Sequence, residues 1–177
     1  MLATRRQCIN TFADHVRRVL EIGDGVFPVN VETCIERLGG QLVRTQQAEE
    51  AKIEKVGESF CITIREGLHP NRERFSLAHE IGHLFLHWGF WIDEDKWNAV
   101  EATGGSPLLR FGYSDQEFEA HEFAAAVLMP KDAFWDEVAK NLADDTIDLR
   151  PVAERFGVSV EAAKLRGRWL GLFRWNS

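Results

Sequence analysis

Three residues within a five-residue stretch have the types and spacing of a metal site: His79, Glu80 and His83, in the pattern HExxH. On a helix, residues four apart project from the same face about one turn, or roughly 6 Å, apart, so both imidazoles can bind one zinc ion. The glutamate points alongside this pair, where it can take a proton from a zinc-bound water instead of binding the metal. The motif therefore predicts a helix-borne zinc site with Glu80 as general base.

The residues around the motif have the periodicity of a helix. Residues 75–88 place apolar side chains on one side and three histidines on another. Gly82 is a small residue that allows another backbone to approach closely. His87, one turn beyond His83, is expected at the helix surface near the cleft and not on the metal. The alternative to a metal site is a surface helix on which two histidines merely stack.

A catalytic zinc site of this kind needs a third protein ligand and an open position for water. A second strongly helical segment, residues 115–128, offers four candidates, which are Glu117, Glu119, His121 and Glu122. Helical periodicity places Glu117 and His121 on one face, and the other two about 100° or more away. The residues alone leave the choice of third ligand open.

Both segments resemble the ImmA/IrrE family of metallo-endopeptidases. RFSLAHEIGHLFLH is similar to that family's RF-LAHE-GH block, and EFEAHEFAAAVLMP to its later E-x-x-A-N/D-x-FA---LLMP block. The similarity extends from PVNVETCIERLGG through RFGVSVEAAKLR and covers most of the chain. The resemblance implies a zincin-like fold and a Zn²⁺ site made of His79, His83 and Glu117. Glu80 is then the base.

One position departs from the family pattern: the chain has His121 where Asn or Asp is usual. Beside the ligands, His121 would orient one of them; as a fourth ligand, it would exclude water and close the site. We expect the first role. Glu119 is the fallback for the third ligand. Tyr113 and Arg110, just before the second helical segment, could stabilise the oxyanion of a tetrahedral intermediate, or be ordinary loop residues.

The resemblance also implies a function, namely zinc-dependent hydrolysis of a specific partner protein. The substrate would be a repressor or antitoxin encoded nearby, typically a helix-turn-helix transcriptional repressor of a mobile element, phage or toxin–antitoxin-like operon. An extended substrate could add to the predicted sheet as a further strand beside residues 60–64.

The competing hypothesis is a DNA- or partner-binding regulator with a vestigial or sensory metal site. Residues 156–159 imitate the turn of a helix-turn-helix, and Lys164, Arg166 and Arg168 follow it. We favour the alternative to direct DNA binding, in which this helical pair packs on the core and its arginines are solvated. The packed residues would be Val152, Phe156, Val160, Ala163 and Trp169.

The remaining sequence predicts a mainly helical α+β fold with a small antiparallel sheet and a C-terminal helical pair. Residues 89–114 have no period and predict a long loop. The expected strands are residues 41–45, 52–56 and 59–64, and the expected helices are residues 8–20, 31–38, 75–88, 115–128, 130–141 and the pair within 150–172.

Length and composition limit the class of protein. With 177 residues and 45% apolar residues, the chain predicts one domain over 1–177. A net charge of −7 argues against a surface devoted to nucleic acid. Cys8, Cys34 and Cys61 are too widely spaced for a disulfide framework, and no apolar stretch has the length of a signal or a membrane span. We therefore expect a cytoplasmic protein without membrane association.

Overall fold

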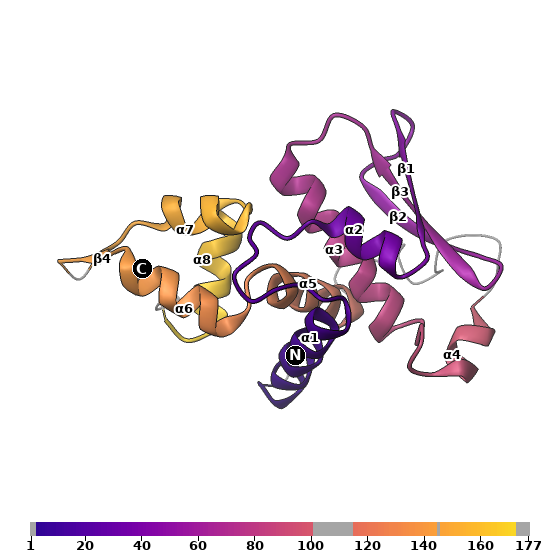
Figure 1. Cartoon of the computed structure of the whole chain (residues 1–177), viewed down its shortest axis with the longest axis horizontal. Helices are drawn as coiled ribbons and strands as arrows, with labels where there is room; N and C mark the ends of the chain where they lie inside the picture. Colours follow the sequence, from indigo (N-terminus) through magenta and orange to yellow (C-terminus); the bar gives the residue numbers. More distant parts are fainter. Residues whose placement is uncertain (1–2, 101–114, 145, 173–177) are drawn as a thin grey trace.

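The computed structural model describes residues 3–100, 115–144 and 146–172. Its fold is α+β and mainly helical, as the sequence predicts. The elements are α1 (Ala3–Val19), α2 (Val31–Arg37), β1 (Gln41–Thr45), β2 (Ala51–Val56), β3 (Ser59–Arg65), α3 (Pro70–Leu86), α4 (Glu94–Ala99), α5 (Asp115–Leu128), α6 (Lys131–Lys140), β4 (Leu142–Ala143), β5 (Thr146–Ile147), α7 (Leu149–Phe156) and α8 (Val160–Trp169). Helices α3 and α5 lie in the middle, with the β1–β3 sheet on one side and α6–α8 on the other (Figure 1).

The three-stranded sheet is mixed, with the order β1-β3-β2. Strands β2 and β3 are antiparallel, as expected, and form a hairpin across Gly57, whose φ is 58°. Strand β1, however, is parallel to β3, so the expectation of an antiparallel sheet is wrong for this pair. The reason is connectivity: a short link reverses the chain between β1 and β2, and the hairpin then folds β3 back between them.

The central position of β3 also corrects the expected substrate-binding strand. Residues 60–64 pair with β1 on one edge and with β2 on the other, so they offer no free edge to an extended peptide. Alternate residues of β3, namely Phe60, Ile62 and Ile64, are buried in the core that α3 also joins. The edges of this sheet are β1 and β2.

Helix α3 begins five residues before the expected start. Pro70 occupies its first turn, where the missing N–H costs nothing, and the His69 Nδ1 atom accepts a hydrogen bond from the Asn71 N–H at 3.2 Å. The segment 70–74 has no apolar periodicity, which is why the pattern misses it. Helix α4 lies within the expected loop. The sequence pattern does not predict it, because six residues are too few to show a period.

Side chains cap the starts of two helices. Asn30 Oδ1 accepts from the Thr33 N–H at the start of α2, and Ser159 Oγ accepts from the Ala162 N–H at the start of α8. Gly157, between α7 and α8, has the left-handed φ of 60° that ends α7.

The C-terminal pair α7–α8 packs on the core, but with a different set of residues from the one expected. Val152, Phe156 and Ala163 are fully buried, whereas Val160 and Trp169 are 46% and 38% exposed. The arginines are not all solvated either, because Arg166 is only 2% exposed. Side chains of α3 fasten the turn of the pair: Asn71 Nδ2 donates to the Val158 carbonyl at 2.9 Å, and Arg74 donates to the carbonyl of Gly157.

Within the described residues, no helix combines the length and the apolar character needed to cross a membrane.

Candidate metal centre

The HExxH residues lie in the second half of α3, pressed against α5. Gly82 faces α5, where a Cβ atom would lie 3.0 Å from the Ala120 Cα and 3.1 Å from its carbonyl oxygen. A side chain at this position would therefore push the two helices apart. The expected close approach of another backbone is confirmed at Gly82, and it brings α5 within reach of both histidines.

Three of the predicted ligands converge in space, and we call them the His–His–Glu cluster: His79, His83 and Glu117. Their ligand atoms all lie within 4.8 Å of one another. The two Nε2 atoms of His79 and His83 are 3.0 Å apart, and each lies 3.2 Å from a carboxylate oxygen of Glu117. Two adjacent helices thus supply two imidazoles and one carboxylate to one point.

The donor set and its spacing fit zinc. Imidazole nitrogen and carboxylate oxygen are ordinary zinc ligands, and a tetrahedron with bonds of about 2.0–2.1 Å has edges of about 3.3 Å. The separations of 3.0 and 3.2 Å in the cluster are close to this edge. Burial and the neighbouring histidines hold the pKa of His83 well below its usual range, which keeps this imidazole in the neutral form that binds metals.

Glu80 is buried beside the cluster and does not join it. The residue is only 5% exposed, and its Oε2 atom has no hydrogen-bond partner in the described part of the chain. Burial raises the pKa of Glu80 to about 7; His79 opposes this increase, while the carboxylates of Glu117 and Glu50 add to it. A carboxyl group with this pKa can both accept and release a proton near neutral pH.

The structure separates the other carboxylates of α5 from the cluster. Glu119, the fallback ligand, faces His87 and Arg5, with its Oε2 atom 3.4 Å from the His87 Nε2 atom. Glu122 accepts from Arg166 at 3.0 Å and from Asn10 at 2.6 Å. Of the acidic candidates, only Glu117 reaches both histidines of the motif.

His121 also lies outside the three-residue cluster, although its ring centroid is 4.4 Å from that of His79. Its Nδ1 atom is 2.9 Å from the backbone carbonyl of Glu117, four residues earlier, so the Nδ1–H group donates to that oxygen. The residue is exposed. This position is adjacent to a ligand, as expected for a residue that orients the cluster. Its role stays a prediction.

His87 does not lie at the helix surface as expected, because its side chain is only 7% exposed. It is the C-cap that follows α3, and its Nδ1 atom lies 2.9 Å from the His83 Nδ1 atom. The only sequence signal for this contact is the four-residue spacing from His83. Tyr113 and Arg110, the predicted oxyanion residues, lie outside the described residues.

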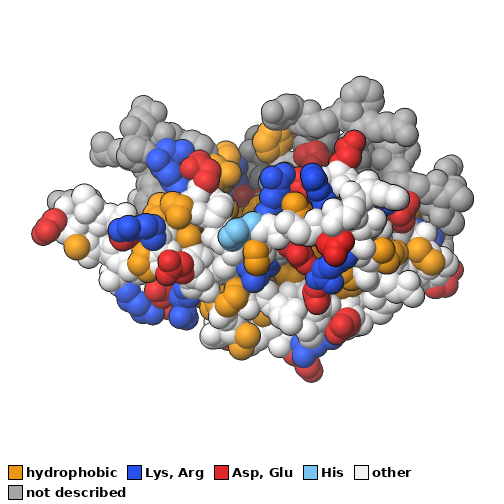
Figure 2. All heavy atoms as spheres, turned by 90° about the horizontal axis from the view of Figure 1, so that it is seen from above, with side chains coloured by type: hydrophobic (Ala, Val, Ile, Leu, Met, Phe, Trp, Pro, Cys, Tyr) orange, Lys and Arg blue, Asp and Glu red, His pale blue; other side chains and the backbone are white. Residues whose placement is uncertain are grey.

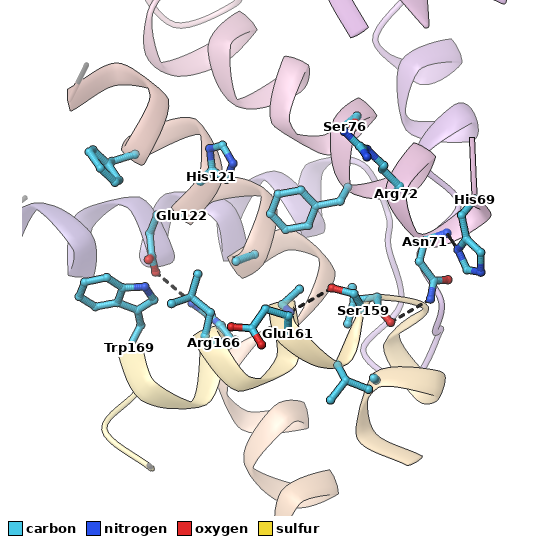
Figure 3. A pocket seen from close by; sticks show the side chains of 18 of the residues that line it. His69, Asn71, Arg72, Ser76, His121, Glu122, Ser159, Glu161, Arg166 and Trp169 are labelled. Carbon is cyan, nitrogen blue, oxygen red and sulfur yellow. Dashed lines mark hydrogen bonds and ion pairs between the residues drawn. The ribbon is translucent and has the colours of Figure 1, made fainter. Parts of the chain in front are cut away.

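A cleft of about 1430 Å³ opens beside the cluster, between α8 and the helices α3 and α5 (Figure 3). Glu117, His121 and Phe75 line it next to the cluster. The exposed apolar residues along the rest of its wall are Phe118, Val160, Leu165 and Trp169. Seen from above, the molecule is hollowed between the C-terminal helices and the remaining chain, with hydrophobic side chains along the hollow (Figure 2).

The fold and the site first define a class: an α+β domain in which a central helix carries HExxH and a second helix adds a carboxylate, as metallopeptidase-type domains do. Residues 29–103 and 106–167 match the IrrE N-terminal-like domain, Peptidase_M78. The chain belongs to this family, which supports a metallopeptidase kind of activity.

Known proteins add a likeness of fold. No curated protein matches the sequence. Among solved structures, a Mycobacterium tuberculosis transcriptional regulator is similar, with a TM-score of 0.58 and 19% identity. The match covers 89% of this chain and 45% of the regulator, so this chain spans less than half of that protein's length. At this identity the likeness concerns the fold alone.

Proposed function

We propose that this chain is a zinc-dependent endopeptidase that cleaves a specific partner protein. The observation that carries the proposal is the convergence of His79, His83 and Glu117 beside the buried Glu80. Two imidazoles and one carboxylate would hold Zn²⁺ and leave a fourth position for water, which distinguishes a catalytic from a structural zinc site.

The chain's own residues supply the proton transfers. When bound, a zinc ion would polarise the scissile carbonyl and make the attacking water more acidic. Glu80 accepts the proton that this water loses and gives it to the departing amine as the C–N bond breaks. Its pKa of about 7 suits both transfers at neutral pH. The hydrogen bond from His121 to the Glu117 carbonyl supports the helix turn that presents Glu117.

The cleft supports a protein substrate. Its apolar wall runs from the cluster along α8, and four large apolar side chains on it stay exposed in the described chain. A polypeptide segment with apolar side chains would bury these four side chains. Exposed apolar surfaces of this kind commonly mark sites of interaction with another protein. We propose a helix-turn-helix repressor or an antitoxin encoded nearby as the partner, in keeping with the family and with the fold shared with a transcriptional regulator.

The test compares the wild type with Glu80→Gln in cells of the source organism or a host carrying the neighbouring genes. Mass spectrometry of new protein N-termini should find a few cleavages that need the wild type and are absent with Glu80→Gln. Both proteins should contain one zinc per chain by elemental analysis, because the amide keeps the shape of the carboxyl group but cannot accept a proton. The same cleavages in both strains would contradict the role of Glu80, and a zinc-free wild type would contradict the metal centre.

The second candidate is a DNA- or partner-binding regulator, favoured by the helix-turn-helix-like pair α7–α8. Much of the basic character of this pair is neutralised within the chain. The ion pairs are Arg150–Asp148, Arg155–Glu137 and Arg166–Glu122. We therefore expect no tight DNA binding. Retention on duplex DNA that falls steeply with salt would favour the regulator instead.

A further inference from the structure

We propose that His87 is a positioning residue for the ligand His83, acting through a chain of contacts that is buried as far as Glu119 and ends at the exposed Arg5. We call this chain the relay; it consists of His83, His87, Glu119 and Arg5. The inference rests on the proposed zinc centre, because it assigns to the relay the task of presenting one nitrogen of His83 to the metal.

The relay joins three helices. From α3, the His83 Nδ1 atom lies 2.9 Å from the His87 Nδ1 atom, and the His87 Nε2 atom lies 3.4 Å from Glu119 Oε2 on α5. From α1, the Arg5 guanidinium lies 2.5 Å from Glu119 Oε1. The side chains of His83, His87 and Glu119 are 4%, 7% and 6% exposed, so water cannot readily replace the contacts among these three; Arg5 is 56% exposed.

The chemistry of the groups gives the relay a direction. An ionised carboxylate only accepts hydrogen bonds, so Glu119, paired with Arg5, requires the proton of His87 on Nε2. The Nδ1 atom of a neutral His87 is then an acceptor, and the contact at 2.9 Å requires the proton of His83 on Nδ1. The Nε2 atom of His83 therefore carries a lone pair toward His79 and Glu117. The donor that the Glu117 carboxylate needs is the Nε2–H group of His79, 3.2 Å from its Oε2 atom.

The consequence is that Glu119 and His87 fix both the tautomer and the ring orientation of His83. Metal-binding histidines generally donate their second N–H to a carboxylate or carbonyl, and loss of that partner typically weakens metal binding about ten- to a hundredfold. Here a second histidine stands between the ligand and the carboxylate. Glu119 thus acts at one remove from the cluster instead of joining it.

The other histidine of the motif provides an internal contrast. The Nδ1 atom of His79 is buried and has no hydrogen-bond partner in the part of the chain that the structure describes. Within these residues, only His83 is held from behind by side chains. The relay therefore predicts that His83 is the ligand with the better-defined tautomer before any metal binds.

Two substitutions of His87 separate positioning from packing. His87→Gln keeps one acceptor and one donor, so it can accept from His83 and donate to Glu119; His87→Leu fills similar space and can do neither. We expect His87→Leu to weaken zinc binding about ten- to a hundredfold and His87→Gln by less than about fivefold, measured by competition with a chromophoric chelator. Glu119→Gln should weaken it about tenfold, since an amide can donate to His87 and reverse the relay.

A second measurement needs no metal. Nitrogen-15 spectra of the imidazoles in the metal-free full chain should show His83 in the Nδ1–H form in the wild type and in His87→Gln. In His87→Leu the two tautomers should mix. Cobalt spectra should show unchanged coordination in every variant that binds metal. Urea denaturation of each metal-free variant reports whether it is folded. If His87→Leu does not fold, Glu119→Gln replaces it in both measurements.

The outcomes separate the relay from the metal centre. A wild type that binds no zinc but shows His83 in the Nδ1–H form, lost in His87→Leu, overturns the proposed function and supports the relay's direction. Equal zinc affinity of the wild type, His87→Leu and His87→Gln overturns the relay and leaves the metal centre standing. Equal weakening by Leu and Gln, with an unchanged His83 tautomer, also overturns it, because the effect is then one of packing.

Discussion

Two glutamates of α5, Glu117 and Glu122, have surroundings of opposite character. Glu122 is enclosed by groups that bring their own positive charge: Arg166 at 3.0 Å and Arg6 at 3.4 Å, with Asn10 as a further donor. Glu117 instead lies 3.2 Å from imidazole nitrogens of two histidines. A guanidinium has donors only and keeps its charge, whereas a neutral imidazole keeps a lone pair. The surroundings of Glu122, which we call the Glu122 end of α5, already neutralise its charge and link neighbouring helices. The surroundings of Glu117, the Glu117 end, can still bind a cation.

The largest expected effect tests the Glu122 end. Arg166→Met should lower the free energy of unfolding by about 3–5 kcal/mol, because it leaves the carboxylate of Glu122 buried without its main partner. Urea denaturation measures the loss. Adding Glu122→Leu to this variant should recover much of it, since no buried charge then remains. Zinc affinity should change by less than about threefold, because the two ends share no side chain. A loss of zinc binding as severe as that of Glu117→Ala would remove the distinction between the ends.

The next effect belongs to the Glu117 end. Zinc at a free concentration of 100 times its Kd should stabilise the wild type by about 2.7 kcal/mol, and a chelator should reverse this. Glu117→Ala at the same zinc concentration should gain almost nothing, because two imidazoles are left to bind the ion. Denaturation curves with and without zinc measure both values. An equal gain in Glu117→Ala would mean that another group is the third ligand.

A smaller loss of stability is expected from Gly82→Ala, which separates the helix of the histidines from the helix of Glu117. The new methyl group would meet the backbone of Ala120 at 3.0 Å, so the variant should lose about 1–3 kcal/mol and bind zinc more weakly as α5 moves from α3. Gly25→Ala is the matched control, because a Cβ there meets nothing within 4 Å. If both alanine variants retain wild-type stability and zinc affinity, the close approach of the two helices is not what assembles the cluster.

The smallest effect is a dependence of stability on pH. Glu80 has a folded pKa of about 7 against an ordinary 4.5, so the folded state keeps a proton that the unfolded chain releases in this window. Stability is therefore lost as the pH rises through 7. Between pH 6 and 8, metal-free wild type should lose about 1 kcal/mol relative to Glu80→Gln.

The comparison with Glu80→Gln is needed because His83 acts in the opposite direction. Its folded pKa is lowered by burial, so its contribution to stability is lost as the pH falls below about 6.5. This contribution is common to both proteins and cancels in their difference. Bound zinc should reduce the Glu80 effect, since a nearby cation favours the ionised carboxylate. Identical pH profiles of the two metal-free proteins would contradict the raised pKa.

Local signals in the sequence were enough for much of the fold. The helix over residues 115–128 and the antiparallel pairing of β2 with β3 depend on neighbouring residues, and both are as expected. The direction of β1 was not predictable, because pairing between distant strands leaves no local pattern. The short helix α4 was missed since one and a half turns cannot show a period.

The candidate site divides in the same way. The four-residue spacing of His79 and His83 places them together on any helix, and the family pattern added Glu117, which the structure brings beside them. The partners of Glu119 could not be predicted, because Arg5 reaches it only through the packing of α1 on α5. Burial of Arg166 was missed for a similar reason, since its position among solvated-looking neighbours on α8 resembles a surface pattern.

The contacts of Asn71 and Arg74 with the turn at Gly157 and Val158 bear on how this chain can be divided or recombined. Helix α3, which carries the histidines, also donates hydrogen bonds to the carbonyls of the turn between α7 and α8. A change in one of these two segments therefore affects the contacts of the other. Exchange of the C-terminal helices for an unrelated module would leave these donors without their acceptors and the carboxylate of Glu122 without Arg166. Under the proposed function, variation that changes the choice of partner falls on the side chains of α8 that line the cleft, while its inward side chains must change together with those of α3 and α5.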